Sequence, residues 1–233
     1  KEITDCFSDI FAQSELDKKR IESLTSRKIR YIGNLKLSSV LIFQNDSNKN
    51  ISFRSKKILM LASTHEDEEK QFLPIIKRML SQISNLKIII APRHPERSKS
   101  ILYLYKKKNI SSKIIKEKNK VLKEDVFIIN TFGNLPYYFN LSDVVFLGGS
   151  FVKKGGHNPI EPAINNCAIV SGPYIHNWQN IYEDMLESKA CIISRKINSL
   201  EKNIKDLLIN DKLLMTMKKR SIKIAQKKFF ESD

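Results

Sequence analysis

Residues 57–91 read KILMLASTHEDEEKQFLPIIKRMLSQISNLKIIIA, and this stretch decides the fold. Two apolar runs, Lys57–Ala62 and Leu86–Ala91, are short and continuous, which is typical of strands buried on both faces. Between them, a cap at Ser63 or Thr64 and an acidic first turn predict a helix, because the helix dipole favours negative charge there. A strand, a helix and a second buried strand in this order indicate a parallel sheet.

The same alternation continues along the rest of the chain. Further strands are predicted at Val126–Asn130, Val144–Leu147, Ala168–Ser171 and Ala190–Ile193, with helices through Lys108, at Ser199–Ile209 and at Asp211–Phe230. The predicted fold class is therefore α/β, a Rossmann-like parallel sheet with helices on both faces.

The N-terminal part has a different organisation. A strand over Asp9–Ser14, a helix over Glu15–Leu24 and a short strand over Arg30–Gly33 precede the polar, turn-rich segment Asn45–Asn50. That segment is the predicted linker. We therefore expect residues 45–233 to form one domain and residues 1–44 to belong partly to another. The first residue is Lys1 rather than Met, so we expect the sequence to be part of a longer chain.

Composition limits the classes of protein that remain. Apolar residues make up 41% of the 233 residues, which suits a globular protein, and no apolar run is long enough to span a bilayer. The net charge of +16 is explained either by an anionic partner, nucleic acid or membrane, or by the abundance of Lys, Ile and Asn typical of AT-rich genomes. The lysines are not interleaved with aromatics as a single-strand stacking platform requires. Cys6, Cys167 and Cys191 are widely spaced, which indicates reduced thiols.

Polar or glycine-bearing segments follow four of the predicted strands. Ligands of open α/β sheets collect beyond the carboxyl ends of the strands, so these segments are candidates for a binding site. They are Ser63–Glu66, Pro92–Arg97, Asn130–Asn134 and Gly148–Pro162.

The last segment, Gly148–Pro162, reads GGSFVKKGGHNPIEP and carries the densest signal. Its two glycine pairs let the backbone expose N–H groups to an anion. Asn158 is the expected helix cap and Pro159 the first helical residue, which predicts an anion site at the helix start. Glu161 is placed to accept hydrogen bonds from both hydroxyls of a ribose.

GGHNPIEP, together with PRHPER and ASTHEDEE upstream, resembles the Kdo (3-deoxy-D-manno-octulosonic acid) transferase family. The resemblance covers about residues 9–185, and it also includes Ala12–Glu15, Gly33–Lys36, Ser171–Pro173 and Asn177. That family is similar to other two-domain GT-B glycosyltransferases, which hold a nucleotide sugar between two Rossmann-like domains. The resemblance implies that this chain is the C-terminal, donor-binding half, and that residues 1–44 are the end of the N-terminal acceptor domain and the connection.

The resemblance also implies CMP-Kdo as the donor and assigns residues to it. The implied donor-binding residues are Pro92, Arg93, Phe132, Gly133, Asn134, Asn158, Pro159, Ile160 and Glu161. Lys36 is implied to stabilise charge as CMP departs, which agrees with the general effect of a fixed cation on a leaving phosphate. Arg93 offers a planar fork of donors for phosphate or carboxylate. One departure is that Asn130 and Asn134 replace the acidic residues of the family pattern DTxGEL, and an amide lacks their charge.

The implied reaction is an inverting transfer of Kdo to the lipid A precursor, lipid IVA. Its general base lies in the N-terminal domain and not in this chain, so the chain by itself is expected to be inactive. The implied place is the cytoplasmic face of the bacterial inner membrane, whose anionic surface the basic charge would contact, with no nucleic acid partner. We expect no cofactor and no metal, because His65, His94 and His157 lack metal-ligand spacing. The alternatives are another GT-B nucleotide-sugar transferase or epimerase, a non-catalytic remnant, and a basic nucleic-acid-binding domain.

Overall fold

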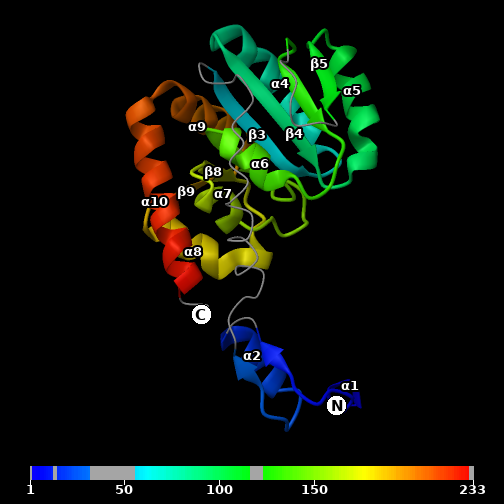
Figure 1. Cartoon of the computed structure of the whole chain (residues 1–233), viewed down its shortest axis with the longest axis vertical. Helices are drawn as coiled ribbons and strands as arrows, with labels where there is room; N and C mark the ends of the chain where they lie inside the picture. Colours follow the sequence, from blue (N-terminus) through cyan, green and yellow to red (C-terminus); the bar gives the residue numbers. More distant parts are fainter. Residues whose placement is uncertain (1, 13–14, 32–55, 116–122, 231–233) are drawn as a thin grey trace.

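The computed structural model describes residues 2–12, 15–31, 56–115 and 123–230. Its main element is a seven-stranded parallel sheet in the order β5-β6-β4-β3-β7-β8-β9 (Figure 1). The strands are β3 (Lys57–Thr64), β4 (Leu86–Pro92), β5 (Ser112–Ile115), β6 (Val126–Ile129), β7 (Val144–Leu147), β8 (Ala168–Ser171) and β9 (Cys191–Ile193). The helices are α4 (Glu68–Gln82), α5 (Ser98–Lys106), α6 (Leu135–Leu141), α7 (Ile160–Ile164), α8 (Gln179–Glu187), α9 (Ile197–Ile209) and α10 (Asp211–Phe230).

Helices cover both faces of the sheet, which confirms the predicted fold class. Alternate residues of β3 face opposite sides: Leu59 and Leu61 pack with α4, α5 and α9, whereas Ile58 and Met60 pack with α6, α7 and α8. The long helix α10 contributes to both layers. Because each strand is buried on both sides, its sequence is continuously apolar rather than alternating.

The strand order changes direction between β3 and β7. The chain runs from β3 to β4, β5 and β6 on one side, then returns to the other side of β3 for β7, β8 and β9. Register pairs Ala62 with Leu147, so the loops that leave β3 and β7 start side by side. Such a switch point is where open α/β sheets bind ligands, because the two loops diverge and leave a crevice between them.

The helix that follows β3, α4, starts later than the sequence predicts. Ser63 and Thr64 belong to β3 rather than capping a helix, and α4 begins only at Glu68. Ser63 and Asp67 both have positive φ, 55° and 73°, so the chain turns twice between strand and helix. Positive φ is usual for glycine, and neither of these two residues is a glycine, so the sequence shows no sign of the turns. The strand β5 and the helix α8 are not among the elements predicted from the sequence. β5 has only four residues, and its two middle residues are not buried, so it lacks a continuous buried apolar run.

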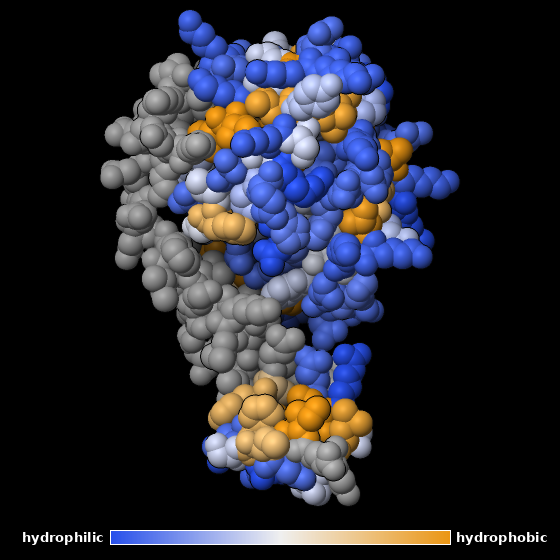
Figure 2. Space-filling model, turned by 90° about the vertical axis from the view of Figure 1, so that its right-hand side faces the viewer, coloured by the Kyte–Doolittle hydropathy of each residue, from blue (hydrophilic) through white to orange (hydrophobic). Residues whose placement is uncertain are grey.

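Residues 2–31 form a small unit of two short helices, α1 (Glu2–Asp5) and α2 (Glu15–Glu22), and a parallel pair, β1 (Phe11–Ala12) and β2 (Arg30–Tyr31). The unit exposes several large apolar side chains, visible as orange atoms at the bottom of Figure 2. The large apolar and aromatic side chains that this unit exposes are Ile3, Phe7, Phe11, Leu24 and Tyr31. A two-stranded sheet is too small for a core of its own. The predicted linker Asn45–Asn50 lies outside the described residues.

The sequence also predicts that no segment spans a membrane and that the cysteines are reduced thiols. Among the described helices, none is both long and apolar enough to cross a membrane. Cys6 is exposed, whereas Cys167 and Cys191 are buried free thiols. Burial raises the pKa of Cys191 to about 12, so this thiol stays protonated at neutral pH.

Candidate functional site

The predicted donor residues stand on loops at one edge of the sheet. Their loops follow β4, β6 and β7, and β3 lies between β4 and β7. They are Pro92 at the end of β4 and Arg93 directly after it, Phe132, Gly133 and Asn134 between β6 and α6, and Asn158, Pro159, Ile160 and Glu161 at the start of α7. Pro92 was expected to end the strand at Ala91, but it pairs with Thr64 as part of β4. The backbone N–H of Arg93 donates to Thr64 (2.9 Å), which ties the β3 and β4 loops together. The predicted charge-stabilising Lys36 lies outside the described residues.

The loop after β7 is held by the buried carboxylate of Glu68. One of its oxygens, Oε2, accepts the backbone N–H groups of His65 (2.9 Å) and Gly149 (2.8 Å). The other, Oε1, accepts those of Ser150 (3.1 Å) and Phe151 (3.0 Å). Burial raises the pKa of Glu68, and these four hydrogen bonds oppose that rise because they stabilise the charged form.

Glu68 corrects one prediction about the glycines. The backbone N–H groups at Gly148 and Gly149 were expected to face a ligand anion, but successive N–H groups from Gly149 onward point at a carboxylate of the protein itself. The second glycine pair serves packing. Gly156 donates to Gly149 (3.1 Å), and a side chain at Gly155 would collide with Asn177. The Glu68 carboxylate therefore occupies the group of backbone N–H donors that a ligand anion was expected to bind.

The helix after this loop is short and begins one residue later than predicted. α7 has five residues, and it starts at Ile160 rather than at Pro159. The Asn158 side chain does accept the Ile160 N–H (3.0 Å), so the predicted capping contact exists, with Asn158 two residues before the start of α7. Five residues sum few peptide dipoles, so the predicted anion site at this helix start is weaker than a long helix would give.

Glu161 lies in the first turn of α7, as predicted. Burial raises the pKa of its carboxyl group, and the adjacent Asn158 amide offsets part of that effect. Asn165 donates to the backbone oxygen of Glu161 (2.8 Å), which leaves the carboxylate to other partners. A mostly desolvated carboxylate next to a loop is suited to accept hydrogen bonds from vicinal hydroxyls.

The segment between β6 and α6 presents an open surface. Phe132 is 72% exposed, which is unusual for a phenylalanine in a loop above a sheet edge. Gly133 has φ +80° and nothing lies within 4 Å of where its Cβ would be. Asn134 donates weakly to Thr131 (3.4 Å). An exposed ring beside an unobstructed backbone can accept a stacked base and its hydrogen bonds.

Two histidines that the sequence did not single out as binding groups meet beside Gly149. The Nε2 atoms of His65 and His157 are 3.3 Å apart, and the rings are stacked at 5.5 Å with an interplanar angle of 8°. Burial, the neighbouring ring and Arg93 lower the pKa of His157 to about 4. Burial, His94, Lys154 and Arg93 lower the pKa of His65, and Glu69 opposes them.

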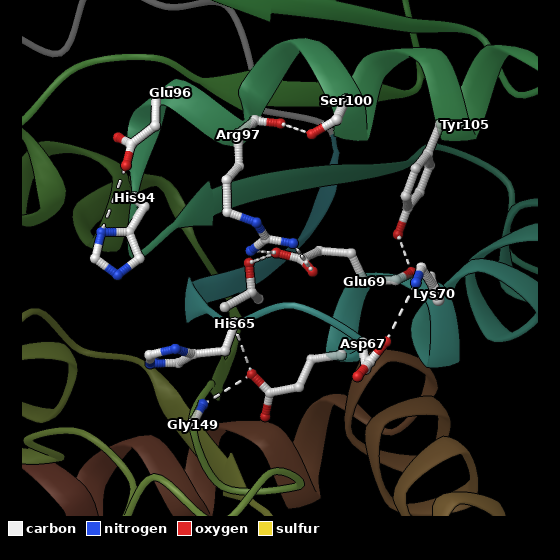
Figure 3. Close-up of polar contacts among 12 residues, drawn as sticks. His65, Asp67, Glu69, Lys70, His94, Glu96, Arg97, Ser100, Tyr105 and Gly149 are labelled. Atoms are coloured by element: carbon white, nitrogen blue, oxygen red, sulfur yellow. Dashed lines mark hydrogen bonds and ion pairs between the residues drawn. The ribbon is translucent and has the colours of Figure 1, made fainter.

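Beside this pair, a second carboxylate holds the other side of the β3 loop (Figure 3). The Arg97 guanidinium donates to both carboxylate oxygens of the buried Glu69, with N···O distances of 2.9 and 3.0 Å. The Thr64 hydroxyl donates to Oε1 of the same carboxylate at 2.7 Å. Tyr105 donates to the Glu69 backbone oxygen. In Figure 3 the His65 ring points away from this network, on the side where His94 lies. The acidic residues predicted to favour the helix dipole therefore fix two loops.

An open cavity of about 520 Å³ lies farther along the same edge, beyond β8 and β9, where Tyr174 and Arg195 help to line it. None of the predicted donor residues lines this cavity. Within the described ranges, no group of three or more His, Cys, Asp or Glu side chains is arranged to hold a metal ion.

Comparison with known proteins gives a consistent family. The 3-deoxy-D-manno-octulosonic acid transferase of Rickettsia bellii is 33% identical over 229 residues, 95% of this chain and 54% of that protein. The Haemophilus influenzae protein of the same name is 29% identical over 85% of this chain. The chain spans about half the length of these curated relatives. No protein-family model matches the sequence.

Solved structures agree. The C-terminal CMP-Kdo binding domain of WaaA from Acinetobacter baumannii is 26% identical, with a TM-score of 0.69 over 75% of this chain and 91% of that domain. Staphylococcus aureus MnaA, solved with UDP, has a TM-score of 0.59 at 13% identity over 90% of this chain and 53% of that one, which shows the fold alone.

The fold and the position of the loops define the class: the main sheet is the C-terminal, Rossmann-like domain of a GT-B protein. Within that class, several sequence relatives are named 3-deoxy-D-manno-octulosonic acid transferase, and the solved domain is named a CMP-Kdo binding domain. The chain belongs to the Kdo transferase family.

Proposed function

We propose that this chain binds CMP-Kdo and serves as the donor half of a glycosyltransferase that transfers Kdo to the lipid A precursor. The observation that carries the proposal is the arrangement at the switch point: Arg93, Gly133 and Glu161 come from three loops that the strand order places at one edge. The 26% identity to a solved CMP-Kdo binding domain supports the same ligand.

The three groups suit three parts of a cytidine nucleotide. Glu161 offers a desolvated carboxylate for the ribose hydroxyls. Gly133 offers open backbone, with the exposed ring of Phe132 beside it, for the base. Arg93 is exposed at the end of β4 and offers charge for the phosphate. Asn134 supplies an amide where the family pattern has an acid, so we expect backbone groups to carry more of the contact there.

The acceptor side of the reaction rests on the family. Lipid IVA as acceptor, inversion at the anomeric carbon and a general base outside this chain remain proposals, as does the role of Lys36. Residues 1–44 are proposed to end the acceptor domain, and the exposed apolar side chains of residues 2–31 support this, since such a patch is normally covered. The net charge of +16 would favour an anionic inner-membrane surface.

Titration calorimetry with CMP, UDP and GDP tests the donor assignment. We expect CMP to bind more tightly than the other two, and Arg93→Ala to weaken CMP by about tenfold or more, since hydrogen bonds to charged groups contribute about 1.5–3 kcal/mol. Lys99→Ala, which removes an exposed charge from α5, is the matched control. No heat change with CMP at millimolar concentration would overturn the proposal.

The same panel tests the rival within the fold. MnaA, solved with UDP, and a putative UDP-N-acetylglucosamine 2-epimerase from Listeria monocytogenes share the architecture at 12–13% identity, so the fold alone does not choose the nucleotide. Preference for UDP would favour such a transferase or epimerase. Binding of nucleic acid with steep salt dependence, uncompeted by nucleotides, would favour the basic-domain alternative.

A further inference from the structure

At the switch point, His65 pairs with His157 and lies edge-on to His94, whose ring centroid is 6.2 Å away. The neighbouring carboxylate of Glu68 is already occupied by four backbone N–H groups. The rings of His65 and His157 stack beside Gly149. The charge of Arg93 lowers the pKa of both histidines, and His94 and Lys154 lower that of His65. Among the described residues, the ion pairs of the structure include neither Arg93 nor Lys154. The one acid that acts on His65 is Glu69, whose two oxygens are already taken by Arg97.

The two rings are held in place from several sides. His157 is anchored by its backbone oxygen, which accepts the Tyr182 hydroxyl (3.2 Å), and it also bonds the backbone of Ser63. His65 is anchored by its backbone N–H on Glu68. A Cβ at Gly149 would lie 3.3 Å from both rings, so a larger residue would push the rings apart by a few tenths of an ångström, in addition to the strain of its positive φ. The pair is therefore a built feature that joins the β3 and β7 loops.

At 3.3 Å, two Nε2 atoms can share only one proton, because two N–H groups facing each other repel. Each neutral ring already carries one proton, so one added proton makes one of the two rings cationic and leaves a single proton between the Nε2 atoms. That cation is disfavoured by the positive charge of Arg93. An anion placed among these groups reverses that balance, since an opposite charge within about 4–6 Å favours the protonated form. Binding of an anion therefore favours binding of a proton to the histidine pair, and a protonated pair in turn binds an anion more tightly.

We propose that His65 and His157, with Arg93 and Lys154, form the anion subsite of the donor pocket, and that the pair takes up a proton when the phosphate of the donor binds. This inference rests on the proposed function, because it gives the donor phosphate its position in the same pocket. It assigns the anion to side chains at the switch point, where Glu68 already occupies the backbone N–H donors.

The chain has four histidines, His65, His94, His157 and His176, so imidazole ¹H–¹⁵N NMR can follow each of them. The probe is the methyl phosphodiester of CMP, whose phosphate does not titrate near neutral pH, with cytidine as the probe without an anion. Calorimetry on the same samples establishes binding independently of any proton. His176, which lies outside the pair, serves as the internal reference.

We expect the phosphodiester to raise the midpoints of His65 and His157 by about one pH unit or more, and to leave His176 unchanged. Its affinity should then rise as the pH falls, by up to about tenfold per unit between the free and bound midpoints. Cytidine should leave all four midpoints in place. His157→Gln should remove the pH dependence of binding, and His176→Gln should keep it.

The outcomes separate the two proposals. If the phosphodiester binds and the midpoints of the pair move by less than about 0.3 unit, the proton-coupled subsite is wrong while the donor pocket stands. If cytidine moves them as far, the anion has no part and the subsite is wrong as well. If neither probe binds, both proposals fall together. Because the NMR arm uses the unmodified chain, a variant that fails to fold does not decide the result.

Discussion

Replacing Glu68 by glutamine is expected to unfold the loop that positions the β7 side of the site. The carboxylate accepts four backbone N–H groups, two on each oxygen, at 2.8–3.1 Å. Glutamine keeps one acceptor oxygen and turns an NH₂ group toward two backbone donors. Two hydrogen bonds are lost and two buried N–H groups are left without an acceptor.

The magnitude follows from that count. An unsatisfied buried donor costs about 1–3 kcal/mol, so two of them cost about 2–6 kcal/mol. This is a large part of a typical unfolding free energy of about 5–15 kcal/mol. We therefore expect Glu68→Gln to lower the urea midpoint strongly, with the amides of Gly149, Ser150 and Phe151 losing protection from hydrogen exchange first.

Urea unfolding followed by the fluorescence of Trp178, the single tryptophan, measures the loss. The matched control is Glu66→Gln, two residues away and exposed, which should change the unfolding free energy by less than about 0.5 kcal/mol. A loss below about 1 kcal/mol for Glu68→Gln, with unchanged exchange of the three amides, would refute the assignment of Glu68 as the anchor of this loop.

Three further predictions concern the same edge of the sheet. The pKa of His157, lowered from 6.5 to about 4, makes the folded chain bind fewer protons than the unfolded chain in that window, so its contribution of about 3 kcal/mol is present above pH 6.5 and lost as the pH falls toward 4. Urea unfolding at several pH values should show a flatter acid limb for His157→Gln; an unchanged limb would contradict the shift. Gly148→Ala should cost about 3 kcal/mol, because its Cβ would lie 2.5 Å from the Ser63 oxygen, whereas Gly133→Ala, with open space and only a positive φ, should cost about 1 kcal/mol in the same assay; equal losses would contradict the close approach. Arg97→Lys should cost about 1–3 kcal/mol, because lysine cannot hold both oxygens of the buried Glu69, and a thermal midpoint equal to that of the unsubstituted chain would argue against this pair.

The sequence predicted the sheet better than the turns. The runs at 144–147 and 168–171 have the bounds of β7 and β8, because a strand buried on both faces needs an unbroken apolar run. The start of α4 was misplaced, since Ser63 and Asp67 adopt positive φ without glycine. A local rule that expects a polar cap after the strand does not detect such a turn.

The candidate site was predicted in part. The loops that carry Arg93, Gly133 and Glu161 were identified from their positions after strands, and the strand order does place them at one edge. Glu68 was interpreted as a helix-dipole residue, because its partners at Gly149–Phe151 are more than 80 positions away. The stacking of His65 on His157 has the same cause, a separation of 92 residues.

By itself the sequence determined the parallel sheet covered on both faces and the order in which its polar loops occur, because burial and turn chemistry act over a few neighbouring residues. Only the tertiary structure decided which side chains and backbone groups of those loops contact one another. It placed β3 next to β7, so a carboxylate from one loop accepted the backbone N–H groups of the other, and two histidines met near the positive charge of Arg93. The physical reason is that hydrogen bonds and charges act through space, and only the strand order brings distant segments within their reach.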